Sequence, residues 1–116
     1  MPNPVVHFEV AGKDPAALTA FYGKAFGWEM QDVMEGQYYM ANPGEGAIQG
    51  GIGGTPPDYP GHVMFYVEVE DPGAALEEIK ALGGSTVMDP MDVPGGPTIA
   101  HFADPEGHVV GLVKRA

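Results

Sequence analysis

Two strand-like segments of this 116-residue chain carry side chains that could transfer protons. His7 and Glu9 are two residues apart in the first segment. The alternation of a strand therefore puts both on one face and leaves Phe8 on the other, toward the following helix. In the second half, the parity of Glu68 turns it inward. A buried carboxylate near an imidazole has the shifted pKa that general acid–base chemistry needs. His7, Glu9 and Glu68 are therefore the candidates for catalytic residues.

The same residues also have a non-catalytic interpretation. A strand histidine such as His7 is more often a hydrogen-bonded wall residue than a base, and Trp28 is by type a core residue. In this interpretation a set of mainly apolar and aromatic side chains lines a cavity that holds a ligand, namely His7, Trp28, Met64, Tyr66 and His101. His62 follows Pro60-Gly61 at a strand start and is expected to be a partly exposed edge residue, and His108 is expected to be solvated.

Composition excludes several classes of function. Five Lys and Arg against 16 Asp and Glu give a formal net charge of −11, which repels nucleic acids and anionic membranes and favours neutral or cationic ligands. Without cysteine the chain has no disulfide, thiolate metal site or catalytic thiol. No segment approaches the roughly 20 apolar residues of a membrane span, and the first residues lack a secretion-signal pattern. We therefore expect a soluble, cytoplasmic protein.

Hydrophobic alternation and turn residues predict one series of elements that occurs twice. Each half contains a strand, a helix opened by Asp-Pro, and three further strands. The first half places these at residues 5–10, 15–26, 28–34, 37–41 and 47–52, and the second at 62–69, 72–82, 85–88, 97–103 and 108–114. Residues 53–60 are rich in Gly and Pro and are interpreted as a linker.

This order predicts an α+β fold in a single domain, residues 1–116, built from two βαβββ modules at about 4–52 and about 61–116. A module of about 55 residues cannot bury both its helix face and its other sheet face alone. The two modules should therefore pair into an open, cup-shaped mixed β-sheet with the helices on the outside.

Seven short motifs follow one another in a family-like order. They are His7-Phe8-Glu9-Val10, Phe21-Tyr22-x-x-x-Phe26-Gly27-Trp28, Val67-x-Val69-x-Asp71, Ala74-Ala75-Leu76, Leu82-Gly83-Gly84, Phe102-x-Asp104-Pro105-Glu106-Gly107 and Gly111-Leu112. Together they resemble the vicinal oxygen chelate superfamily, also called the glyoxalase/bleomycin resistance/dioxygenase superfamily. The Phe-Gly-Trp ending and the Gly-Gly of the fourth strand are most similar to its glyoxalase-like branch.

The resemblance implies a small-molecule site and, in the metalloenzymes of the family, a divalent ion held by one His or Glu from each of four strands. His7 stands at the first of these positions. The others carry Gly50 or Gly51, Met64 and Gly111. Glycine offers no side-chain ligand, and a thioether is a poor ligand for a hard divalent ion. We therefore expect no metal ion and no other cofactor.

Three functions remain open. The favoured hypothesis is a metal-free, small-molecule-binding protein with no defined substrate. The alternative is a glyoxalase-like lyase or isomerase, or a dioxygenase-type enzyme, with a non-standard or metal-dependent site. Its acid–base groups would be His7 with Glu9 or Glu68, and an unorthodox metal site would combine His7 with Glu68 or His101. The third is an accessory subunit without a cavity. A homodimer is expected because a small sheet leaves edges that a symmetric partner can cover. The sequence does not tell whether modules are exchanged between the chains.

Overall fold

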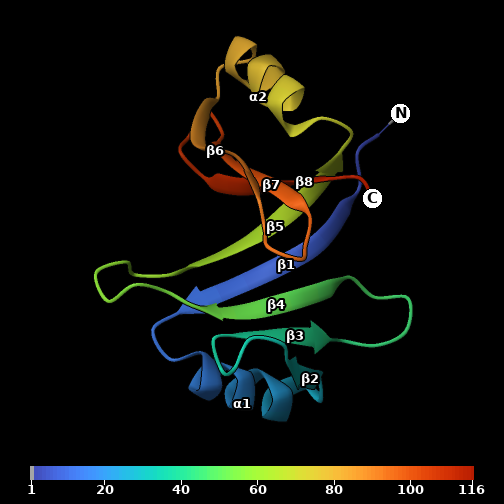
Figure 1. Cartoon of the computed structure of the whole chain (residues 1–116), viewed down its shortest axis with the longest axis vertical. Coiled ribbons are helices and arrows are strands. Elements are labelled where there is room, and N and C mark those ends of the chain that lie inside the picture. The colour runs from blue at the N-terminus through green and yellow to red at the C-terminus, as the bar shows by residue number, and fades with distance from the viewer. Residues whose placement is uncertain (1) are drawn as a thin grey trace. The chain divides into compact units, whose positions relative to one another are not determined.

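The computed structural model describes residues 2–116, and over that range it contains eight strands and two helices in the order βαβββ twice (Figure 1). This confirms the predicted α+β class. The chain divides into two compact units. The first unit is His7–Met64, and the second unit is Phe65–Ala116 together with the described residues before His7. Each unit contains an open sheet of four strands in which parallel and antiparallel pairs are mixed.

The elements of the first βαβββ series are β1 (Val5–Gly12), α1 (Pro15–Phe26), β2 (Glu29–Asp32), β3 (Tyr38–Asn42) and β4 (Gln49–Gly54). The strands lie in the order β2-β3-β4-β1, with β1 parallel to β4 and the other neighbours antiparallel. The carboxylate of Asp14 accepts a hydrogen bond from the Ala17 N–H and caps α1. Gly27 ends the helix in the left-handed region, at a φ of 72°.

Aromatic rings fill the space between α1 and the sheet of the first unit. The ring of Phe8 lies 5.3 Å from the ring of Trp28, which stacks at 5.7 Å on the ring of Tyr22 from α1. Phe8 therefore faces the helix, as strand alternation predicted. His7 and Glu9, its neighbours along β1, have the opposite parity and lie on the other face of the sheet.

The elements of the second series are β5 (His62–Val69), α2 (Pro72–Ala81), β6 (Ser85–Asp92), β7 (Thr98–Ala103) and β8 (Val109–Lys114). The strands lie in the order β5-β8-β7-β6, with β5 parallel to β8. The core of the second unit consists of Val69, Leu76, Ala100 and Leu112, with Phe102 and Ile79 packed against it.

Several strands have bounds that differ from the prediction, and two of these differences have a clear cause in hydrogen bonding. β6 continues past the expected residue 88 because it stays paired with β7 through irregularities in the register until Asp92 lies opposite Thr98. β4 continues to Gly54, inside the expected linker, because the Gly54 N–H donates to the carbonyl of Gln37. Neither helix in the described chain is long and apolar enough to cross a membrane.

Candidate functional site

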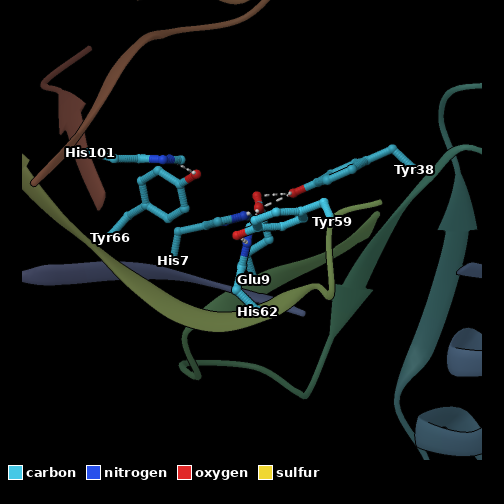
Figure 2. Close-up of polar contacts among 7 residues, drawn as sticks. All are labelled: His7, Glu9, Tyr38, Tyr59, His62, Tyr66 and His101. Atoms are coloured by element: carbon cyan, nitrogen blue, oxygen red, sulfur yellow. Dashed lines mark hydrogen bonds and ion pairs between the residues drawn. The ribbon is translucent and has the colours of Figure 1, made fainter. Parts of the chain in front are cut away.

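A cluster of five polar side chains lies in the first unit around the carboxylate of Glu9, and we call it the Glu9 cluster (Figure 2). Its members come from separate parts of the unit: His7 and Glu9 from β1, Tyr38 from β3, Tyr59 from the segment before β5, and His62 from the start of β5. The cluster therefore forms only when the sheet is assembled.

One side of the cluster is a chain of short hydrogen bonds. The Nε2 atom of His62 lies 2.8 Å from Oε2 of Glu9, and its Nδ1 atom lies 2.8 Å from the hydroxyl of Tyr59. The side chains of His62 and Glu9 are 20% and 16% exposed, so both are partly shielded from water while remaining reachable. Carboxylate, imidazole and phenol thus lie in series, an order that can pass or orient protons.

On the other side of the cluster, longer contacts join Tyr38 to both β1 residues. The Tyr38 hydroxyl donates to Oε1 of Glu9 at 3.4 Å and lies 3.3 Å from Nε2 of His7. Burial raises the pKa of Tyr38, and the charge and hydrogen bond of Glu9 raise it further, so this phenol keeps its proton. Burial lowers the pKa of His7, opposed by the charge of Glu9, so the neutral imidazole is favoured.

The position of Tyr38 depends on two glycines of β4, Gly51 and Gly53. Glu9 on β1 pairs with Gly51, and a side chain at Gly51 or Gly53 would overlap the ring or hydroxyl of Tyr38. The phenol therefore takes the place that side chains at these two positions would occupy.

The position of His62 depends on the glycine before it. Gly61 has a φ of 97°, and a side chain there would collide with the carbonyl of Ala11. This turn directs the chain into β5 with His62 toward Glu9.

A second polar pair lies in the second unit, where the Tyr66 hydroxyl is 3.0 Å from Nε2 of His101 (Figure 2). Tyr66 pairs with Gly111, and a side chain at Gly111 would overlap the Tyr66 ring. Of the two candidate positions on β4, Gly50 faces Phe8 on the helix side and Gly51 lies on the face of Glu9. In each unit, therefore, a tyrosine covers a glycine that the family resemblance makes a candidate metal-ligand position, Gly51 in one and Gly111 in the other. This repetition within separate units is the main structural finding about the site.

In the structure, the predicted site residues fall into separate groups. His7 and Glu9 lie together, and Tyr66 and His101 lie together. Trp28 instead packs against Phe8, on the helix side of the first sheet.

Two further candidates are held elsewhere. Met64 is 5% exposed in the core. Glu68 is 3.3 Å from the guanidinium of Arg115 in the second unit, where it forms an ion pair.

Two functional candidates were missed by sequence reasoning. His62 is not simply a strand-edge residue, because it bonds Glu9 on one side and Tyr59 on the other. Its parity within β5, the same as that of Met64 and Tyr66, was the available signal. For Tyr59, in a Pro-rich segment 50 residues from Glu9 along the chain, the sequence holds no comparable signal.

The lowered pKa of His7 predicts how stability depends on pH. Between that lowered pKa and the ordinary value of 6.5, the unfolded chain binds more protons than the folded one. The His7 contribution to the free energy of unfolding is therefore complete above pH 6.5, decreases as the pH falls through this window, and levels off below the folded-state pKa. Urea denaturation from pH 7.5 to 5 should show a steeper loss for the natural chain than for His7→Gln. Identical slopes would contradict the burial of His7.

The residues present do not fit the metal centre of the family. His7 offers an imidazole, but Gly51 and Gly111 offer no side-chain ligand and are covered by phenol rings, and Met64 offers only a thioether. Within residues 2–116, no group of three or more His, Asp or Glu is arranged to hold a metal ion. The donor set therefore argues against a resident divalent ion.

Comparison with known proteins gives consistent matches. The family model described as "Glyoxalase/Bleomycin resistance protein/Dioxygenase superfamily" matches residues 5–112. The chain is 27% identical to "Putative glyoxylase CFP32" of Mycobacterium tuberculosis, covering 93% of this chain and 42% of that protein. It is also 27% identical to the anthracycline biosynthesis protein DnrV of Streptomyces peucetius, covering 98% and 48%. The chain thus spans less than half the length of these relatives.

Solved structures match the fold. Methylmalonyl-CoA epimerase from Mycobacterium tuberculosis has a TM-score of 0.71 at 14% identity, covering 97% of this chain and 87% of that one. The hypothetical protein BH1468 from Bacillus halodurans has a TM-score of 0.73 at 14% identity, covering 100% and 96%. At these identities the likeness concerns the fold alone.

Proposed function

Because the chain belongs to the glyoxalase/bleomycin resistance protein/dioxygenase superfamily, we propose that it binds a small organic molecule at the Glu9 cluster without a resident metal ion. The observation that carries this proposal is the cover of Gly51 by Tyr38 and of Gly111 by Tyr66. At positions where metalloenzymes of the family carry ligands, this chain has glycines, and tyrosine rings occupy the space that a ligand side chain would need.

The Glu9 cluster has the features of a ligand site. Tyr38 and Tyr59 provide aromatic surface together with hydroxyl groups, while Glu9 provides a partly exposed carboxylate. A few polar groups beside aromatic rings are typical of sites that fix the orientation of a small molecule. Neutral His7 adds a hydrogen-bonding group without adding charge.

A second candidate function is an enzyme of the lyase, isomerase or dioxygenase type. The 2.8 Å contact between His62 and Glu9 favours it, since a carboxylate held by an imidazole is a general base in suitable surroundings. The names of the relatives point in the same direction, as glyoxylase and as a protein of anthracycline biosynthesis. Substrate turnover abolished by Glu9→Gln would establish this function.

A homodimer in the cytoplasm stays part of the proposal. The relatives are more than twice as long as the segment they share with this chain, so two copies would approach the length of one relative.

Metal analysis tests the proposal directly. Protein stripped with a chelator and dialysed against Zn²⁺, Ni²⁺ or Mn²⁺ should retain far less than one ion per chain, and its melting temperature should not rise. Metals that bind the folded state would raise it by mass action. If the protein retained one ion per chain and the His7→Ala variant lost it, the proposal of a site without a resident metal ion would be contradicted.

A thermal-shift screen of small organic molecules tests the binding half of the proposal. Molecules that raise the melting temperature should lose their effect in Glu9→Gln and keep it in Glu70→Gln. Glu70 is the matched control because it is a carboxylate in an exposed ion pair with Arg115, in the second unit. A screen without a stabilising molecule, or one in which both variants respond equally, would overturn the assignment of the site.

A further inference from the structure

The chain from Glu9 through His62 to Tyr59 has a direction set by its chemistry. A carboxylate only accepts hydrogen bonds, so Nε2 of His62 carries the proton that lies between it and Glu9. In a neutral imidazole with that proton on Nε2, the acceptor is Nδ1, and the hydroxyl of Tyr59, 2.8 Å away, is the donor. In this state the phenolic proton of Tyr59 is directed at His62, and toward any further partner its oxygen can only accept.

The contact of Tyr38 has the same direction. Its hydroxyl donates to Glu9, and its raised pKa keeps the proton in place. With His62 neutral and protonated on Nε2, both phenols of the cluster direct their protons inward, one to the carboxylate and the other to the imidazole bound to it. A molecule that reaches the exposed Tyr59 meets a phenol oxygen that can accept a hydrogen bond and an aromatic ring with electron-rich faces.

From this arrangement we propose that Tyr59 is a ligand-contacting residue, that His62 and Glu9 position it as a hydrogen-bond acceptor, and that the ligand is an organic ammonium ion. The inference rests on the proposed binding function and names the class of ligand for that same site.

Charge and access support the class. The net charge of −11 and the carboxylate of Glu9 attract cations and repel anions. Aromatic faces near a carboxylate bind ammonium groups through cation–π attraction. Tyr59 is 41% exposed, so a ligand can reach it from solvent. An anionic ligand would meet oriented acceptors and a negative charge, and both would oppose its binding.

Three probes with one ring and different charge test the class, namely benzylammonium, benzyl alcohol and benzoate. Calorimetric titration of the full chain at pH 7.5 should show benzylammonium binding at least about tenfold more tightly than benzoate. Tyr59→Phe should weaken benzylammonium by about tenfold, the loss expected for one hydrogen bond to a charged group. Tyr39→Phe is the matched control, since it removes a phenol outside the cluster and should leave the affinity unchanged.

The positioning role of His62 and Glu9 has a spectroscopic test. In protein labelled with ¹⁵N at histidine, His62 should be the neutral tautomer with its proton on Nε2. Tyr59→Phe should keep this tautomer, whereas Glu9→Gln should lose the preference. If Glu9→Gln does not fold, Tyr59→Phe still tests the proposal, because Tyr59 is largely outside the core.

The outcomes separate the two levels of the proposal. Equal binding of benzoate, unchanged affinity in Tyr59→Phe, or a proton on Nδ1 of His62 would overturn the ammonium assignment, and hits in the wider screen would leave the binding function standing. If no probe binds, the ammonium class is wrong. If the wider screen also finds nothing, the binding function is wrong as well.

Discussion

Replacing Gly51 by glutamate should destabilise the protein by about 3 kcal/mol and should not create a metal site. A side chain at this position would overlap the hydroxyl and ring of Tyr38, which are held beside His7 and Glu9. The new carboxylate can be accommodated only if the phenol of Tyr38 moves away from the β4 backbone against which it packs. Urea denaturation measures the stability, and metal analysis after dialysis against Zn²⁺ measures the ion content.

A double substitution shows whether Tyr38 is the cause. Gly51→Glu combined with Tyr38→Ala should recover part of the loss, with a coupling free energy of about 1 to 3 kcal/mol between the two positions. Gly73→Ala is the control because the nearest atom to a side chain there is 3.4 Å away, on Asp71, and the residue lies in α2. It should be neutral or slightly stabilising. A Gly51→Glu variant that is as stable as the natural chain and holds one zinc ion would refute the metal-free account.

Replacing Leu76 by alanine should lower the free energy of unfolding by about 2 to 5 kcal/mol. Leu76 is 3% exposed and packs with Val69, Ala100 and Leu112 in the core of the second unit, so its removal leaves a cavity. Equilibrium denaturation monitored by circular dichroism measures the change.

Leu82 provides the comparison within the same region. It caps the end of α2 and is 75% exposed, so Leu82→Ala removes the same atoms without opening the core. Its effect should stay within about 0.5 kcal/mol. Similar losses for both variants would show that Leu76 does not anchor the core.

Much of the fold was predictable because its signals are local. The Asp14-Pro15 and Asp71-Pro72 pairs begin α1 and α2 as expected, and in both helices the aspartate side chain caps the first turn. Strand alternation placed Phe8 toward the helix and Glu9 on the other face. The end of β6 was not predictable, since it depends on pairing with β7 through irregular register.

The Glu9 cluster was only half predictable because it depends on contacts between distant segments. Parity identified His7 and Glu9, but the bond from Glu9 to His62 joins residues 53 positions apart. Likewise, the sequence shows that Gly51 has no side chain but not which ring covers it. That depends on the pairing of β3 with β4, where Met40 lies opposite Gly51 and Tyr38 opposite Gly53. Register of this kind is a tertiary property.

The fit between Tyr38 and the glycines of β4 also limits how this chain can change. An ion-binding side chain at position 51 requires a larger residue there and a smaller one at Tyr38, and the enlargement made first costs stability. Two coupled substitutions of which the first is unfavourable are a difficult route for natural variation. Variants of this chain should therefore differ more readily in the side chains around Tyr38 than at Gly51.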